Sequence, residues 1–169
     1  MPVSDYIRRL RDRVGHDLLL LPSVTGLVFD GQRRVLLVKS VDADAWHFPG
    51  GFVEPNERPA SALVRELWEE TGLVTRPRRL VGVFGGPGYE FTYPNGDRSS
   101  YMTAAFECEV VDGRLHAQDG EIVDFTWAER DAIAGLRIAP WALEIVAAAW
   151  DSDAPAAFAG PTWAPPASG

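Results

Sequence analysis

The stretch that decides the fold runs from Gly51 to Leu73 and reads GFVEPNERPASALVRELWEETGL. As a pattern it is Gly-x5-Glu-x7-Arg-Glu-Leu-x-Glu-Glu-x-Gly-Leu, with seven fixed residue identities and two aliphatic positions. At average residue usage, a complete match in a chain of this length has a chance probability on the order of 10^-7. The pattern therefore carries information that composition alone does not explain.

Most of this stretch is expected to form one helix, from about Arg58 to Thr71. Pro59 suits the first helical turn, and Gly72 suits the left-handed residue that ends a helix. Residues three and four apart share one side of a helix, so the three glutamates after Arg65 should project together. These are Glu66, Glu69 and Glu70, and the adjoining stripe expected to face the core is Ala60, Leu63, Val64 and Leu67.

Three carboxylates on one arc repel one another, and folding alone gives no reason to tolerate that repulsion. A bound cation would resolve it. Oxygen ligands select hard ions, so the pattern favours Mg²⁺ or Mn²⁺ over zinc. Arg65 precedes Glu69 by four positions and is expected to orient a ligand carboxylate rather than to stand on the ion's own face.

With these residues in place, the chain resembles a Nudix hydrolase, and Gly51–Leu73 resembles the Nudix box. The preceding Trp46-His47-Phe48-Pro49-Gly50 also looks like the family's usual approach to the box. The resemblance implies an α/β/α sandwich with a mixed β-sheet between helices. It also implies hydrolysis of a pyrophosphate, linked to a nucleoside or other group, by metal-activated water.

The resemblance also implies roles for particular residues. The metal ligands would be Glu66, Glu69, Glu70 and the carbonyl of Gly50, with Mg²⁺ or Mn²⁺ as cofactor. Glu57 would support this cluster, and Glu121, ahead of a strand carrying Trp127, resembles a further catalytic glutamate in many relatives. Asn56 stands where relatives commonly have Gly, but Asn tolerates positive φ well enough for the turn to form. The implied catalytic set is thus Glu57, Arg65, Glu66, Glu69, Glu70 and Glu121.

The remaining sequence predicts strands on both sides of the box helix and helices at both ends, which itself favours a mixed sheet between helical layers. Asp30-Gly31 is typical of a hairpin turn, and Gly85-Gly86-Pro87-Gly88 of a flexible loop between two strands. The expected helices are Asp5–Val14, a short one near Glu129–Ala134, and Pro140–Trp150; the expected strands are Val24–Phe29, Arg34–Val41, Trp46–Phe48, Arg79–Phe84, Tyr89–Tyr93, Ser99–Val111 and Glu121–Ala128.

Length and composition set the domain organisation. The 169 residues suit one domain at 1–150, with an N-terminal helical extension at 1–21 and an Ala/Pro-rich tail at 151–169. Whether Phe158 and Trp163 dock the tail onto the domain is open. The net charge of −8 argues against a stable nucleic-acid partner, and no run is apolar enough for a membrane span. Cys108 is the single cysteine, so no internal disulfide is possible and we expect a cytoplasmic protein. The thiol itself looks packed and inert, and a homodimer is left open.

The substrate is the least determined point. Expected substrates are a nucleoside triphosphate, a nucleotide sugar such as ADP-ribose, or a dinucleoside polyphosphate, and RNA 5′ ends stay open. The Pro and Tyr signatures that separate these classes in relatives both occur here, at Pro87 and Tyr89. Trp46, Tyr89 and Tyr93 are the candidates to stack on a base. The alternatives are a non-catalytic nucleotide-binding sensor and, more weakly, an isoprenoid diphosphate isomerase, which would use an active-site cysteine.

Overall fold

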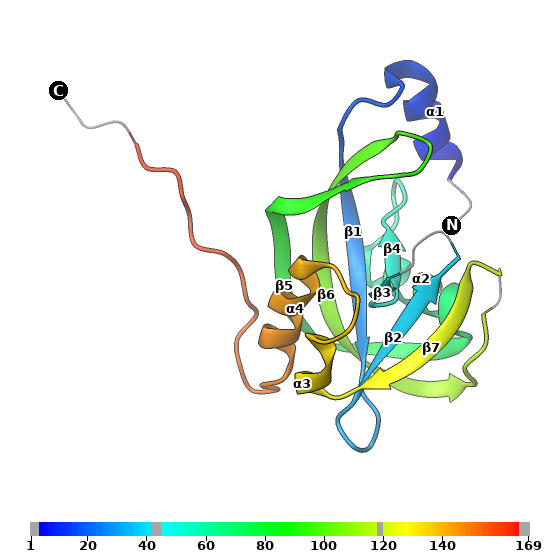
Figure 1. The fold of residues 1–169 in the computed structure, drawn as a ribbon, viewed down its shortest axis with the longest axis vertical. Helices are drawn as coiled ribbons and strands as arrows, with labels where there is room; N and C mark the ends of the chain where they lie inside the picture. Colours follow the sequence, from blue (N-terminus) through cyan, green and yellow to red (C-terminus); the bar gives the residue numbers. More distant parts are fainter. Residues whose placement is uncertain (1–3, 42–44, 118–119, 166–169) are drawn as a thin grey trace.

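The computed structural model describes residues 4–41, 45–117 and 120–165 (Figure 1). Within these ranges, four strands follow the first helix, three follow the second, and two helices end the fold. They are α1 (Asp5–Val14), β1 (Leu19–Val28), β2 (Val35–Ser40), β3 (Trp46–His47), β4 (Gly50–Phe52), α2 (Pro59–Thr71), β5 (Leu73–Thr92), β6 (Arg98–Gly113), β7 (Ile122–Ala128), α3 (Arg130–Ile133) and α4 (Pro140–Ala149).

The strands form two sheets. The larger has the order β4-β1-β6-β5, with β1 and β6 parallel and the other pairs antiparallel. The smaller is antiparallel, with the order β3-β2-β7. The expected mixed sheet with flanking helices is therefore confirmed, and the second sheet is an addition to it.

Alternate residues of β1 face two separate cores, because successive side chains of a strand point to opposite sides. Leu27 belongs to a core built with α3, α4, β2, β5 and β6, whereas Val24 and Val28 belong to a core built with α2. In β2, Val35 and Leu37 join the first core and Leu36 the second. This alternation gives the helix–sheet–helix layering and puts α2 on one side with its own core.

Helix α2 forms where the box predicts it. Pro59 occupies its first turn, and Gly72 ends it in the left-handed conformation at φ 69°. Leu63 and Leu67 are fully buried, as expected, but Ala60 is exposed. The prediction for Ala60 is wrong because the helix turns its start toward solvent and buries Ala62 instead. Within residues 4–41, 45–117 and 120–165, the helices are all too short or too polar to cross a bilayer.

The two strands expected around the glycine loop are one long strand, β5. The loop prediction was wrong because the glycines make an irregularity inside the strand rather than a break. Pairing with β6 shifts register between Gly85 and Glu90, where Gly86 and Gly88 have φ of 96° and 92°. The strand thus continues through the segment at the cost of local irregularity.

The Asp30 turn forms as predicted, although it joins two sheets. The Asp30 carboxylate accepts hydrogen bonds from the backbone N–H groups of Gln32 and Arg34, at 2.9 and 2.8 Å. One bridge between Phe29 and Val35 closes the turn, after which β1 and β2 diverge into different sheets. The Asp30-Gly31 sequence therefore predicted the turn correctly, but it did not predict that β1 and β2 pair with other strands.

The C-terminal end of α4 is held by two arginines from other elements. Arg79 donates to the carbonyls of Ala149 and Asp151 at 3.0 and 3.1 Å, and Arg33 donates to Ala149 at 3.1 Å. Both arginines also bond Glu107 of β6, each at 3.0 Å. Positive groups satisfy the exposed carbonyls at a helix C-terminus, so this cluster fixes α4 to the larger sheet.

After α4 the tail adds one residue to the edge of β5. Ala157 donates its N–H to Val81 at 2.8 Å and accepts from the N–H of Val83 at 3.0 Å. The contact runs through backbone, since the rings of Phe158 and Trp163 are exposed. Beyond it the tail runs outward from the body of the molecule (Figure 1).

Candidate active site

The site begins at two glycines of β4, the strand that ends the larger sheet. Gly50 has φ 152°, and a Cβ there would lie 2.2 Å from the Val24 carbonyl oxygen. A Cβ on Gly51 would lie 2.4 Å from the carboxyl carbon of Glu66. The pair of glycines therefore lets helix α2 bring a carboxylate directly against the strand.

Two glutamates of α2 face this strand. Glu66 and Glu70 are one helical turn apart, and only 2 % and 5 % of their surface is exposed. A Glu70 carboxylate oxygen accepts a hydrogen bond from the Gly50 N–H at 2.9 Å. This bond ties the helix to the glycine pair and orients the carboxylate of Glu70 toward it.

Arg65 gathers the other carboxylates. Its Nε and Nη2 donate to the two oxygens of Glu57, both at 3.0 Å. Its Nη1 donates to Glu66 at 2.8 Å and to Glu69 at 3.1 Å, and Nη2 also reaches the Phe52 carbonyl at 3.1 Å. The sequence predicted an orienting role through one carboxylate, whereas the guanidinium contacts three.

The electrostatic balance of the cluster is negative, since the three carboxylates that contact Arg65 share one guanidinium. Burial raises the pKa of Glu66 to about 7, although Arg65 opposes that shift. The hydrogen bond from Arg65 lowers the pKa of Glu57, and Glu57 in turn raises the pKa of Arg65. Arg65 thus offsets the negative charge of Glu57 well and that of Glu66 only in part. A further cation beside Glu66 would stabilise its ionised form.

The donor set fits a hard divalent ion in kind, because every donor is a carboxylate or backbone oxygen. Among the residues that the structure describes, however, no three His, Cys, Asp or Glu side chains are grouped as metal ligands. Arg65 explains this, since its hydrogen bonds direct Glu57, Glu66 and Glu69 toward the guanidinium. The carboxylate oxygens that an ion would need are present, and in this structure they bond the Arg65 guanidinium.

Glu121 lies immediately before β7, at the far edge of the smaller sheet from β3. Its carbonyl accepts from the Val41 N–H at 2.8 Å, beside the end of β2. Its role as a catalytic base stays a prediction.

The structure divides the three residues expected to stack on a base. Trp46 bridges to Ile138, and Tyr89 packs its ring 5.7 Å from that of Trp141, at the start of α4. Both therefore border the segment that leads into α4. Tyr93 lies instead at the turn between β5 and β6, where its hydroxyl meets that of Tyr101.

Two polar contacts of the structure were not anticipated from the sequence. Tyr89 donates its hydroxyl to Glu144 of α4 at 3.0 Å, and burial, with Glu144 adding to the effect, raises the Tyr89 pKa. Thr25 and Thr103 share a buried hydroxyl–hydroxyl bond of 2.9 Å between β1 and β6. Glu144 was visible as a lone charge in an apolar helix, but the threonine pair depends on strand register that the sequence does not reveal.

Comparison with known proteins agrees with this architecture. The family model for the NUDIX domain matches residues 19–149. The chain is 32 % identical over 121 residues to an ADP-ribose pyrophosphatase of Methanocaldococcus jannaschii, covering 69 % of this chain and 68 % of that protein. It is 30 % identical over 112 residues to a MutT-like protein of Streptomyces ambofaciens, covering 66 % of each chain.

A solved structure of similar fold is the MutT protein of Methanosarcina mazei, with a TM-score of 0.66 and 22 % identity. The similarity covers 78 % of this chain and 93 % of that one. This similarity shows the fold, an α/β/α sandwich. The chain belongs to the Nudix family, and it is a Nudix hydrolase.

Proposed function

We propose that this Nudix hydrolase cleaves a nucleoside diphosphate linked to another moiety, with Mg²⁺ or Mn²⁺ as cofactor. The observation that carries the proposal is the cluster itself: Glu66 and Glu70 are buried against Gly50 and Gly51, and Arg65 joins Glu57 and Glu69 to Glu66. A surplus of carboxylates at a glycine strand matches the requirement of a polyphosphate substrate, which brings its own negative charge and needs cations.

The chain's residues take the following roles in this proposal. Glu66, Glu69 and Glu70, with the Gly50 carbonyl, hold the ion, and Glu57 and Arg65 orient the carboxylates. A divalent ion bound there polarises phosphoryl oxygens and lowers the pKa of water. One of the box glutamates or Glu121 accepts the proton of the attacking water. The incompletely compensated Glu66 would lose its high pKa once a cation is close.

ADP-ribose is the first substrate to try, because the Methanocaldococcus jannaschii relative is an ADP-ribose pyrophosphatase. Trp46 and Tyr89 are the aromatic residues we assign to the base, since both border the segment that leads into α4. Tyr93 instead bonds the Tyr101 hydroxyl at the turn between β5 and β6, so we assign the base to Trp46 and Tyr89 alone. Nucleoside triphosphates, dinucleoside polyphosphates and RNA with a 5′ polyphosphate end complete the panel.

The test is product chromatography over this panel, or phosphate freed from the products by an added phosphatase, with Mg²⁺, Mn²⁺ or a chelator. Glu70→Gln keeps the size of the side chain and removes its charge, so we expect kcat/KM to fall about 100-fold or more. Glu129→Gln, an exposed residue before α3, is the matched control and should leave the rate unchanged. Wild-type turnover in Glu70→Gln would remove Glu70 from the ion's ligands.

Family membership favours turnover over the non-catalytic sensor, because relatives of this chain are enzymes by name. A sensor would bind nucleotide in calorimetry and form no hydrolysis product under any metal condition. We further propose a cytoplasmic enzyme that acts on small molecules without a stable nucleic-acid partner, in keeping with its net charge of −8.

A further inference from the structure

We propose that Tyr101 is a positioning residue for the Arg65 carboxylate cluster and that helix α1 holds Tyr101 in place. The inference rests on the proposed function, since it assigns to that same site a support from residues outside the box. It also makes α1, which precedes the matched residues 19–149, a working part of the enzyme.

Arg65 is bound to the backbone of Phe52. The Phe52 carbonyl accepts from Nη2 of Arg65 at 3.1 Å, and the same nitrogen donates to Glu57 at 3.0 Å. A guanidinium is planar and its donors form a rigid fork, so its bonds cannot shift independently. Movement of the Phe52 backbone would therefore tilt Arg65 and change its bonds to the carboxylates.

The second step links Phe52 to Tyr101. Their rings stack with centroids 5.6 Å apart and planes at 29°. Strand register explains the contact: Ser23 of β1 pairs with Phe52 on one side and with Thr103 on the other. Tyr101 lies two residues before Thr103, so it shares that face, and the two rings meet across β1. Such ring pairs favour one defined geometry.

The third step holds the Tyr101 ring from its outer end. Its hydroxyl is hydrogen-bonded to that of Tyr93, and burial raises the pKa of both groups, so both stay protonated. Tyr93 is fixed by the turn between β5 and β6, where its N–H donates to Asp97 and its carbonyl accepts from Gly96, both at 2.8 Å. The position of this turn therefore sets the position of Tyr101.

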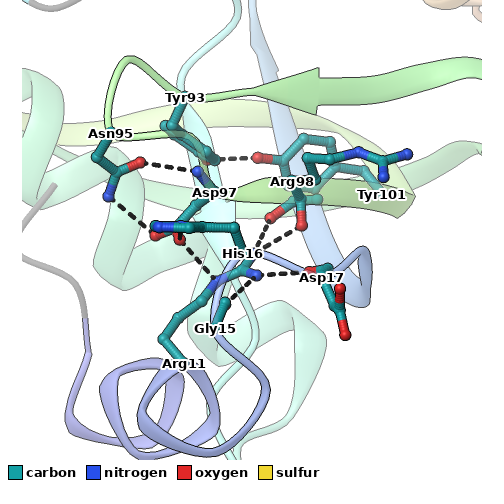
Figure 2. A network of polar contacts seen from close by, with 10 residues as sticks. Arg11, Gly15, His16, Asp17, Tyr93, Asn95, Asp97, Arg98 and Tyr101 are labelled. Carbon is teal, nitrogen blue, oxygen red and sulfur yellow. Dashed lines mark hydrogen bonds and ion pairs between the residues drawn. The ribbon is translucent and has the colours of Figure 1, made fainter.

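The fourth step ties the turn to α1, as Figure 2 shows. Arg11 of α1 donates to the carbonyls of Asp17 and Arg98, both at 2.6 Å, and its Nε lies 3.6 Å from the Asp97 carboxylate. His16, just after the helix, bonds the same carboxylate at 2.7 Å. Only 11 % of the Arg11 side chain is exposed, so this is an inserted clamp rather than a surface ion pair.

A purely structural role for Tyr101 would affect stability without changing the dependence on metal. The central comparison is therefore Tyr101→Phe, which keeps the ring, against Tyr101→Leu, which removes the stack. Tyr101→Phe keeps the stack but loses the bond to Tyr93, so we expect it to raise the half-saturating Mg²⁺ concentration by about 3-fold, as loss of the contact to α1 should. Tyr101→Leu should raise the half-saturating Mg²⁺ concentration and lower kcat, each about 10-fold, with KM for ADP-ribose or the best panel substrate changed less than about 3-fold.

A double-mutant cycle tests the path. Phe52→Leu and Tyr101→Leu break the same stack, so the double variant should resemble either single variant rather than their product. Arg11→Gln tests the clamp, with an expected shift of about 3-fold in the same direction. Arg13→Gln, exposed on the same helix, is its control and should match wild type.

A readout independent of turnover separates the two proposals. The Nε–H signal of Arg65, assigned with Arg65→Lys, can be followed by ¹⁵N NMR in the metal-free protein. We expect it to shift or broaden in Tyr101→Leu and to move by a smaller amount in Tyr101→Phe, which keeps the stack and loses the bond to Tyr93. An unchanged signal together with unchanged Mg²⁺ dependence, or additive effects in the cycle, would overturn the positioning role. Absence of hydrolysis by wild type across the panel would instead overturn the proposed function, and the NMR comparison would still decide the role of Tyr101.

Discussion

At the scale of single residues, Gly51 decides how closely the Glu66 carboxylate approaches β4. A methyl group in Gly51→Ala would occupy the space of that carboxylate, so either Glu66 turns away or α2 moves. We expect kcat/KM to fall at least about 10-fold and the free energy of unfolding to drop by about 1–3 kcal/mol. Steady-state kinetics and urea denaturation measure the two effects.

Gly31→Ala is the matched control for that experiment, since a Cβ at Gly31 would meet open space. It should leave both rate and stability near wild type. If Gly51→Ala behaves in the same way, the close packing of Glu66 on β4 is not needed for activity.

Cys108 offers a test of burial at one residue. Burial, with Glu107 adding to the effect, raises the thiol pKa to about 12. Because the unfolded thiol ionises near 9, iodoacetamide at pH 8.5 should alkylate the native protein about 10³-fold more slowly than the unfolded chain. A raised folded pKa favours the neutral thiol, so its contribution to stability is lost as pH rises from about 9 toward 12.

Mass spectrometry measures the alkylation without ambiguity, since the chain has one cysteine. The protein unfolded in guanidinium chloride is the reference and should react completely. Equal rates for the native and unfolded chains would mean that the thiol is accessible, against its burial between β6 and α2.

The residues of the cluster were predictable because the box spacing and helical periodicity together fix Glu57, Arg65 and the three glutamates that follow. The contact between Arg65 and the Phe52 carbonyl was not, because it depends on how β4 meets α2 in space. The Tyr101 stack was hidden for the same reason, since it joins residues almost fifty positions apart through a third strand.

At the scale of elements, the end of α4 depends on Arg79. This side chain joins Glu107 to the last carbonyls of the helix and is largely buried. Arg79→Met should lower the free energy of unfolding by about 1–3 kcal/mol, because it leaves buried acceptors without their donor. Chemical denaturation checks this.

Arg76→Met on the same strand is the comparison. Arg76 pairs with Glu109 at 2.9 Å, but both side chains are about half exposed, so the expected change is within about 0.5 kcal/mol. Equal losses in the two variants would contradict the capping role of Arg79.

Helices were predicted better than strands, and physical range explains the difference. The limits of α1 and α2 follow from local signals: a periodic apolar stripe, a first-turn proline and a terminal glycine. The continuation of β5 through Gly85–Gly88 follows from pairing with β6, which lies beyond the reach of local signals. The glycines correctly indicated an irregular backbone, but the loop that we predicted from them is a continuous strand.

At the scale of the whole molecule, the layered fold was predictable and the division into two sheets was not. Strand-rich segments around a central helix favour an α/β/α sandwich. After the isolated bridge between Phe29 and Val35, β1 and β2 enter different sheets. Both strands are apolar enough to be buried in either sheet, so their composition does not predict which partner each takes. The contact between Ala157 and β5 was also not predictable from the sequence, because it is made by backbone atoms, which every residue carries.

That tail contact bears on how copies of the protein meet one another. β5 is the last strand of the larger sheet, and an open strand edge is a template for joining another chain. Ala157 occupies part of this edge, so removal of residues 155–169 should increase concentration-dependent association, measured by sedimentation velocity. Removal of 162–169 alone keeps Ala157 and should behave like the full chain. If the two truncated chains sediment alike, the contact of Ala157 with β5 does not limit the association of one copy of the protein with another.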